Sequence, residues 1–437
     1  MSLSRRTFLG SGAAIAAGAP AFANAANERV QVGFVGTGAR AHELMPALLA
    51  NAGVEIVAVT DAYKGRVERA IERTGGRAKP YKSYKDIFAD KSIDAVVIAT
   101  PDHWHRTMVL EAMAAGKDVY CEKPLTYRSA EGVEIIGAAR KLGRIVQVGS
   151  QGMSSVLQKK AREVIQQGKL GKVTIVRAAY NRNTASGAWI YPIPPDASPQ
   201  TVDWEAFLGA APKRPYSNER FFRWRCYDDY SGGIATDLFV HLCTTIHYLM
   251  GAKAPSQVMA MGQLYRWKES RDVPDTINAI LEYPEGFVVN LSSTFNNQTQ
   301  SESGFEFLGT EGTLSLGGDG LNIYPERGVE DNRWIVESWP RRLEDEYYRD
   351  PKVRETELPA TRKPKVLPGT ESYLSEGPEA TVLHFANWLN SIRTRQPYWE
   401  DATAGHHAAA CAHMVNLSAR EKRMVAWDFA RDDIRRG

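Results

Sequence analysis

The chain of 437 residues has few cysteines, no long apolar run after its N-terminus, and little excess charge. Its four cysteines form no C-x-x-C pair, so we expect buried thiols, and disulfides between them stay open. They are Cys121, Cys226, Cys243 and Cys411. Without an apolar run of about 20 residues the chain is not expected to cross a membrane. At this length a globular chain is expected to form two domains.

The N-terminal stretch SRRTFLGSGAAIAAGAPAFANA contains paired Arg5 and Arg6, then a weakly apolar segment, then alanines at candidate cleavage points. This order predicts a twin-arginine export signal over residues 1–25, and a periplasmic or otherwise exported protein. Removing the signal lowers the formal charge from +3 to +1, because these residues hold no other ionisable side chain. So small a charge argues against a nucleic-acid partner.

The segment RVQVGFVGTGARA predicts a strand, a glycine-rich turn and the start of a helix. Gly36, Gly38 and Ala41 follow the G-x-G-x-x-A pattern, in which the glycines let the backbone approach a pyrophosphate at the helix N-terminus. A second strand, VEIVAVTD, ends at Asp61, about 20 residues further on, where an acidic residue binds the ribose of NAD. The sequence therefore predicts bound NAD, while the nearby Lys64 and Arg66 leave NADP open.

Strands and helices continue to alternate up to about residue 150, which predicts a doubly wound parallel sheet over residues 26–150. Ligands bind such sheets beyond the carboxyl ends of the strands. Pro101, Lys123 and Gln151 each follow a predicted strand. A lysine there can direct its ammonium group at a substrate oxygen beside the nicotinamide.

At this point the sequence resembles the Gfo/Idh/MocA oxidoreductases. The resemblance rests on GFVGTGARA, VIATPDHWH, AAGKDVYCEKPLT, GGIATDLFVH and FEFLGTEGTLSL, which occur in that order between Val30 and Leu316. It implies a Rossmann domain followed, over residues 151–437, by an α/β domain with a large open, mostly antiparallel sheet. It also implies a homo-oligomer, a dimer or a tetramer, that forms through this sheet.

The same resemblance implies a catalytic set. Lys123 matches the lysine of the family's E-K-P motif, and Asp237 and His241 match its D-x-x-x-H motif. The apolar segment IATDLFVHLCTTIHYLM predicts a helix, so residues 237 and 241 lie one turn apart on one face. We expect His241 to act as the base, Lys123 to polarise the hydroxyl, and Asp237 to orient the sugar or the histidine.

The remaining candidate residues bind the cofactor or the substrate. The cofactor residues are expected to be Gly36, Gly38, Arg40, Ala41, Asp61, Thr100, Pro101, His105, Glu122, Lys123 and Gln151. Aromatic side chains suit the apolar faces of a sugar, and the candidates are Trp104, Tyr180, Trp189 and Trp224. No recognisable zinc spacing occurs, so no metal is expected. A charged, proline-rich stretch over residues 329–375 predicts a surface insertion.

Together these features predict an exported carbohydrate oxidoreductase that transfers hydride between a sugar carbon and tightly bound NAD(P). Because NAD is scarce outside the cytoplasm, we expect a ping-pong cycle in which a second sugar returns the hydride. Two alternatives stay open: a glycosidase or lyase that oxidises its sugar transiently, and a non-catalytic sugar-binding protein that retains the nucleotide.

Overall fold

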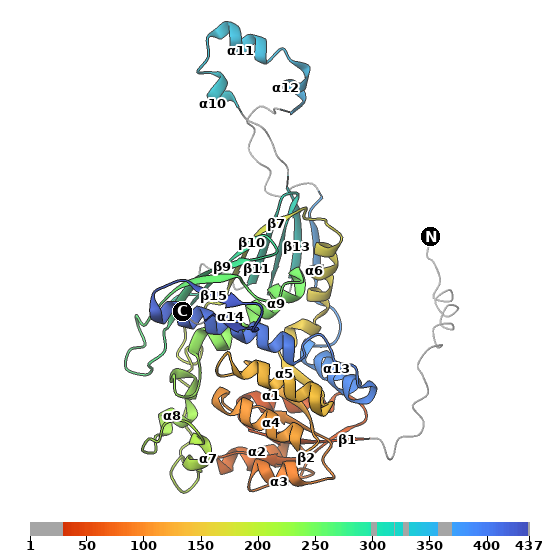
Figure 1. Ribbon diagram of the computed structural model, residues 1–437, viewed down its shortest axis with the longest axis vertical. Helices are drawn as coiled ribbons and strands as arrows, with labels where there is room; N and C mark the ends of the chain where they lie inside the picture. The colour runs from red at the N-terminus through yellow and green to blue at the C-terminus, as the bar shows by residue number, and fades with distance from the viewer. Residues whose placement is uncertain (1–28, 299–303, 319, 327–331, 357–368, 436–437) are drawn as a thin grey trace, which may run out of the picture.

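The computed structural model describes residues 29–298, 304–318, 320–326, 332–356 and 369–435, so the predicted export signal lies outside the described residues. Two sheets organise the fold, one with six parallel strands and one with ten mostly antiparallel strands (Figure 1). This arrangement confirms the predicted fold class.

The six-stranded sheet has the order β3-β2-β1-β4-β5-β6. Every residue of β4 and β5 is buried, because helices cover both faces of a doubly wound sheet. The strands are β1 (Val30–Val35), β2 (Val54–Thr60), β3 (Lys79–Pro80), β4 (Ala95–Ile98), β5 (Asp118–Glu122) and β6 (Val146–Gly149). The helices of this part are α1 (Ala39–Leu49), α2 (Lys64–Arg73), α3 (Tyr84–Ala89), α4 (His105–Ala114) and α5 (Glu131–Leu142).

One face of this sheet is completed by a helix from near the end of the chain, α13 (Ala380–Thr394). Its Phe385 and Trp388 are fully buried in the core that contains Phe34 of β1 and Leu44 of α1. The side-chain amide of Gln147 also donates to the His384 carbonyl at 2.7 Å. The predicted second domain therefore does not include all of residues 151–437, because α13 packs on the first sheet. The sequence of this helix is apolar but carries no sign of which sheet it covers.

The ten-stranded sheet has the order β14-β13-β12-β11-β7-β10-β9-β8-β15-β16. Buried and exposed residues alternate along β9, as expected when helices cover only one face. Helices α6 (Val156–Gln166), α9 (Val240–Met250) and α14 (Ala402–Glu421) form one core with that face (Figure 1). The strands are β7 (Val173–Ala179), β8 (Gln257–Gln263), β9 (Thr276–Tyr283), β10 (Phe287–Thr294), β11 (Gly304–Gly309), β12 (Gly312–Gly317), β13 (Gly320–Pro325), β14 (Glu371–Leu374), β15 (Val425–Asp428) and β16 (Asp433–Ile434).

The connections between these parts carry short helices. An aromatic cluster that includes Val202, Phe207 and Phe222 packs against Tyr63 of the first domain. The helices of this connection are α7 (Trp204–Leu208) and α8 (Asn218–Phe222). The predicted insertion holds β14, which pairs with β13 at the edge of the sheet, and three helices, which Figure 1 shows beyond the end of the sheet. They are α10 (Arg333–Val336), α11 (Arg341–Tyr347) and α12 (Pro351–Thr356). No helix in the described part of the chain is long and apolar enough to cross a bilayer.

Candidate active site

A cleft of about 780 Å³ opens where the carboxyl ends of the parallel strands face the second domain. It brings together residues that lie up to 206 positions apart in the sequence, from Val35 to His241. Of the residues predicted from the sequence, those lining it are Gly36, Gly38, Arg40, Asp61, Thr100, Pro101, Trp104, Glu122, Lys123, Gln151, Tyr180, Trp189, Trp224, Asp237 and His241.

The glycine-rich turn forms the floor of one half of the cleft. Gly36 has a φ of +81°, and a Cβ there would lie 2.8 Å from the Ala99 carbonyl oxygen, so only glycine fits. Gly38 begins α1 without a side-chain cap, and the first turn of the helix has no acidic residue. Its backbone N–H groups are therefore suited to an anion such as a pyrophosphate. Ala41 does not line the cleft and is instead buried against the sheet, where it allows close packing of the helix.

Asp61 is held rigidly at the end of β2. Its carboxylate accepts hydrogen bonds from the backbone N–H groups of Thr37 at 2.7 Å and Tyr63 at 2.9 Å. The Arg66 guanidinium lies 3.7 Å from the same carboxylate and lines the cleft beside Gly38. An acidic group placed in this way suits a ribose diol, whereas the cation beside it leaves a 2′-phosphate open. The donors of this half of the cleft therefore fit a nicotinamide dinucleotide.

Glu122 and Gln151 line the cleft, but their side chains form hydrogen bonds mainly with each other and with their neighbours. The Gln151 amide donates to the Glu122 carboxylate at 2.7 Å and to the Tyr120 hydroxyl at 2.6 Å. Arg40 donates to Glu122 at 3.2 Å. Burial alone would lower the pKa of Arg40, but Glu122, Tyr120 and Glu43 together outweigh it and raise that pKa above its usual range. These three side chains fix the strand ends on which a cofactor would rest.

His105 is not a cofactor contact, and the prediction that it binds the nucleotide is wrong. It is fully buried below the cleft, where its ring nitrogens lie 2.6 Å from the Pro124 carbonyl and 3.0 Å from the Thr100 carbonyl. The histidine thus ties the end of β4 to the turn after Lys123. Its place four residues after the predicted strand end at Pro101 gave no sign that α4 would turn the ring inward.

The other half of the cleft holds a buried ion network centred on Asp237. The Lys123 ammonium donates to the Asp237 carboxylate and to its backbone carbonyl, both at 2.8 Å, and Arg225 donates to the carboxylate at 2.9 Å. Burial would raise the pKa of Asp237, but the two cations outweigh it and hold that pKa well below its usual range. Asp237 therefore stays ionised and fixes both cations, rather than orienting His241.

Asp237 and His241 both face the cleft, as their spacing predicted. Asp237 lies in a π-helical turn, Ala235–Phe239, which runs directly into α9, and such turns are frequent at functional sites. His241 is half-buried, and no hydrogen bond to its ring occurs within the described residues. Burial and the Lys123 charge lower the pKa of His241 to about 3, so its imidazole is neutral near neutrality.

Two charged residues of the site were not predicted from the sequence. Arg225, in an aromatic segment before the helix, also lies 4.2 Å from the centre of the Trp224 ring. Asp102 is 3% exposed, lines the cleft, and has one carboxylate oxygen without a partner among the described residues. Burial and the negative charge of Asp237 raise the pKa of Asp102 to about 7. A charged residue among aromatic side chains was the only signal for Arg225.

In the described part of the chain, the side chains that could bind a metal ion do not gather into a metal site. Within the described residues, no three His, Cys, Asp or Glu side chains are arranged to hold a metal ion. His103, next to the cleft, instead faces the Phe207 carbonyl through a ring nitrogen at 2.9 Å.

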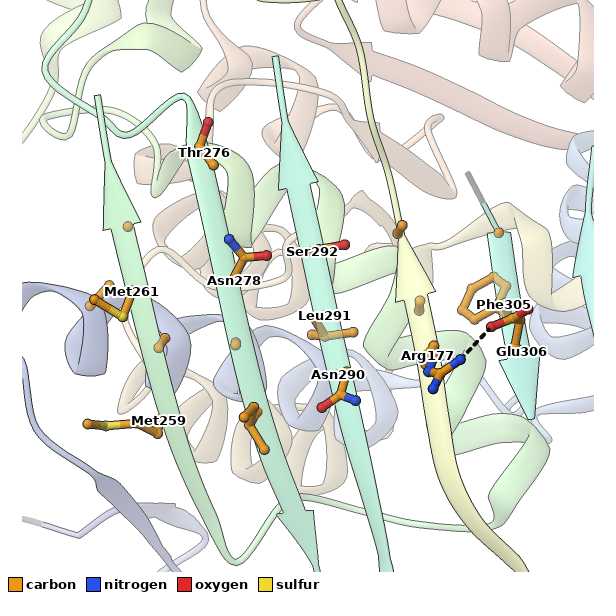
Figure 2. Close-up of a pocket in the computed structure, with 18 of the residues that line it drawn as sticks. Arg177, Met259, Met261, Thr276, Asn278, Asn290, Leu291, Ser292, Phe305 and Glu306 are labelled. Carbon is orange, nitrogen blue, oxygen red and sulfur yellow. Dashed lines mark ion pairs between the residues drawn. The ribbon is translucent and has the colours of Figure 1, made fainter. Parts of the chain in front are cut away.

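A second feature lies on the face of the large sheet that no helix of the described residues covers. A shallow hollow of about 1430 Å³ lies there, and Figure 2 shows the side chains of neighbouring strands that line it. Met261 is 79% and Ile280 58% exposed on this open sheet face, and Arg177 forms an ion pair with Glu306 at 3.6 Å. Apolar surface of this kind is typical of a protein contact and lies apart from the cleft.

Two protein-family models match the chain, one over the first domain and one over part of the second. The model of an oxidoreductase family with an NAD-binding Rossmann fold matches residues 30–150. The GFO/IDH/MocA C-terminal domain matches residues 209–315. Together the two matches cover more than half of the chain.

Curated relatives align over parts of their length. Trans-1,2-dihydrobenzene-1,2-diol dehydrogenase of Mus musculus is 25% identical over 271 residues, 61% of this chain and 69% of that protein. Inositol 2-dehydrogenase of Salmonella typhimurium is 34% identical over 134 residues, 30% of this chain and only 40% of that protein. 1,5-anhydro-D-fructose reductase of Ensifer adhaerens is 25% identical over 299 residues, 68% of this chain and 77% of that protein.

Solved structures match over nearly the whole chain. Levoglucosan dehydrogenase in complex with NADH and levoglucosan matches with a TM-score of 0.66 and 19% identity, covering 91% of this chain and 99% of that one. Aldose-aldose oxidoreductase from Caulobacter crescentus matches with a TM-score of 0.64, also at 19% identity, and covers 91% of this chain and 99% of that one. At such identities these likenesses show the fold alone.

Proposed function

The chain belongs to the Gfo/Idh/MocA family of oxidoreductases, and we propose that it transfers hydride between a hydroxyl-bearing carbon of a carbohydrate and NAD(P). The observation that carries the proposal is the buried network of Lys123, Asp237 and Arg225 beside a neutral His241. This network lies in the same cleft as the glycine-rich turn. Sugar and polyol chemistry agrees with the names of the relatives, which include an inositol dehydrogenase and an anhydrofructose reductase.

The chain's own residues supply the proton chemistry. The Gly36 to Gly38 turn, Asp61 and the end of β4 would hold the dinucleotide, and bound nicotinamide supplies the hydride acceptor. Lys123 donates two of its N–H groups to Asp237, which leaves the third for the substrate oxygen. As the carbinol hydrogen leaves with its electron pair, the neutral His241 takes the hydroxyl proton, and Lys123 stabilises the developing oxyanion.

The rest of the cleft selects the substrate. Tyr180 and Trp224 line it together with Arg225, and aromatic faces beside hydrogen-bonding groups suit a pyranose. Trp189, predicted as a third such face, is fully buried in the core and presents no ring surface to a sugar. A panel of neutral sugars and polyols should be offered with NAD or NADP while the absorbance of reduced nicotinamide is followed. We expect at least one to be oxidised by wild-type protein and not by His241→Ala. Binding of NAD without oxidation of any member would overturn the proposal.

We also propose that the protein is exported and keeps its nucleotide through turnover, with a second sugar returning the hydride. The support is the paired Arg5 and Arg6 before an apolar stretch, since the compartment outside offers no supply of NAD. Protein purified from the periplasm without added nucleotide should release stoichiometric NAD or NADP on denaturation, measured by mass spectrometry. An empty protein that needs fresh NAD for each turnover would contradict this.

Finally, we propose that copies of the chain associate through the open sheet face (Figure 2). The exposed Met261 and Ile280 lie there among short polar side chains, so contact between copies would remove apolar area from water. Light scattering should report a dimer or tetramer for the wild type and a smaller species for a Met261→Glu, Ile280→Glu variant. A monomeric wild type would contradict the proposal.

A further inference from the structure

Beyond His241 the cleft adjoins a second cavity of about 460 Å³, which we call the second pocket. Tyr180 and His241 line both spaces, so the second pocket begins at the proposed base. Its volume lies within the range of roughly 300–1,000 Å³ that is usual for small-molecule sites. Apart from His241 and Tyr180, the function proposed above gives its lining residues no role.

The second pocket continues the helix face that carries the catalytic residues. Thr244 and Thr245 of α9 lie three and four residues after His241, and Asp237 lies four before it. Residues at this spacing share one face of a helix, so the four side chains form a continuous stripe. A molecule that places one end at His241 is therefore directed along α9 into the second pocket.

The lining of the second pocket is polar but carries no formal charge. Among the residues that the structure describes, no Asp, Glu, Lys or Arg lines it, in contrast to the main cleft, and beyond His241 the polar side-chain groups are hydroxyls and one amide. The Ser150 and Thr244 hydroxyls lie 3.5 Å apart, and the Gln158 amide nitrogen donates to the Thr245 hydroxyl at 3.1 Å. This chemistry suits a neutral, hydroxylated ligand and disfavours sugar acids and phosphates.

One polar atom in this wall has no partner. Gln158 is 9% exposed, and its amide oxygen accepts no hydrogen bond from any residue that the structure describes. A buried acceptor left unpaired is unfavourable, and a hydroxyl of a bound ligand that reached this oxygen would pair it. Across the pocket, Tyr180 and Phe305 offer ring surface to the apolar face of a sugar.

From these contacts we infer that the second pocket binds a second neutral sugar ring, next to the ring whose carbon reacts at His241. The inference rests on the proposed function for the position of the first ring. The second ring is either joined to the first, as in a disaccharide, or a separate molecule, and both use the same hydroxyl and ring contacts.

Binding can be measured without turnover, by saturation-transfer NMR on wild-type protein loaded with NADH. The probes are maltose, cellobiose and lactose, together with free glucose and galactose. If both rings of a disaccharide are saturated on the wild type, and one ring loses its saturation on Gln158→Leu, the second ring is joined to the first. Two molecules of a free sugar bound per protein, reduced to one in the variant, support a separate second sugar.

The matched control is Gln166→Leu, which removes an exposed amide from the same helix outside the pocket. We expect Gln158→Leu to weaken binding of the second ring about tenfold, the loss of one buried hydrogen bond, and Gln166→Leu to leave it unchanged. Equal affinities in all three proteins, or no second ring bound by any probe, would overturn the inference. Binding of a second ring by a protein that oxidises no sugar would instead overturn the proposed function alone.

Discussion

The two halves of the active-site cleft are built by different means. The half under the parallel strands is made mainly of backbone: the Gly36 turn, the N–H groups at the start of α1, and a carboxylate, Asp61, held by two further N–H groups. The other half is made of buried charges, where Lys123 from the end of β5 and Arg225 from the second domain converge on Asp237.

This difference separates binding from chemistry. Backbone N–H groups and glycines bind an anion without protons that titrate near neutrality, so the first half should hold nucleotide over a wide pH range. Buried charges depend on each other, and removal of one leaves the others uncompensated. Substitutions should therefore affect either binding of the nucleotide or turnover, according to the half in which they lie.

The largest expected effect comes from Lys123→Met, which keeps the length of the side chain and removes its charge. We expect turnover to fall by about 10²–10⁴-fold, because the substrate oxygen loses its cation, while binding of NAD stays within a few fold. Steady-state kinetics and a calorimetric titration with NAD check the two parts. Lys141→Met, on the exposed surface of α5, is the control. Equal losses of binding and turnover would erase the distinction between the halves.

Gly36→Ala should have the opposite signature. Its φ of +81° and the 2.8 Å approach of a Cβ to the Ala99 carbonyl force the turn to shift, at about 1–3 kcal/mol. We expect the affinity for NAD to fall about tenfold or more, with a lower melting temperature.

The control for that variant is Gly137→Ala in α5. A Cβ there meets no atom within 4 Å, so the change should stabilise the helix by about 0.5–1 kcal/mol. Unchanged affinity in Gly36→Ala would contradict the role given to the turn.

A smaller effect is expected from Asp102→Asn, measured as stability against pH. Burial raises the pKa of Asp102 from 3.8 to about 7, so between these values the folded protein holds a proton that the unfolded chain has lost. The carboxyl therefore contributes stability that is lost as pH rises through about 7. The variant should gain on the order of 2 kcal/mol over wild type at about pH 8 and little at about pH 4. Denaturant unfolding at both pH values checks this, and a gain independent of pH would contradict it.

The sequence predicted the first half more fully than the second because its determinants are local. Gly36, Gly38 and Asp61 lie within 26 residues and follow one strand–turn–helix–strand unit, so their places follow from the pattern. Lys123, Asp237 and His241 came from the family resemblance together with helical spacing. That Arg225 joins them depends on how a loop returns across the cleft, which no periodicity encodes. The inward turn of His105 and the return of α13 to the first sheet were also not predicted from the sequence, because both depend on tertiary packing that no periodicity encodes.

The most direct test of the account is a single turnover with nucleotide already bound. Wild-type protein and Lys123→Met, both loaded with NAD, are mixed with a sugar that the panel identifies, carrying hydrogen or deuterium at the reacting carbon. We predict a rapid rise in reduced-nicotinamide absorbance for the wild type, slowed by deuterium, and no such rise for the variant although its NAD stays bound. An equal rise in both proteins, or none in the wild type, would contradict hydride transfer at this network.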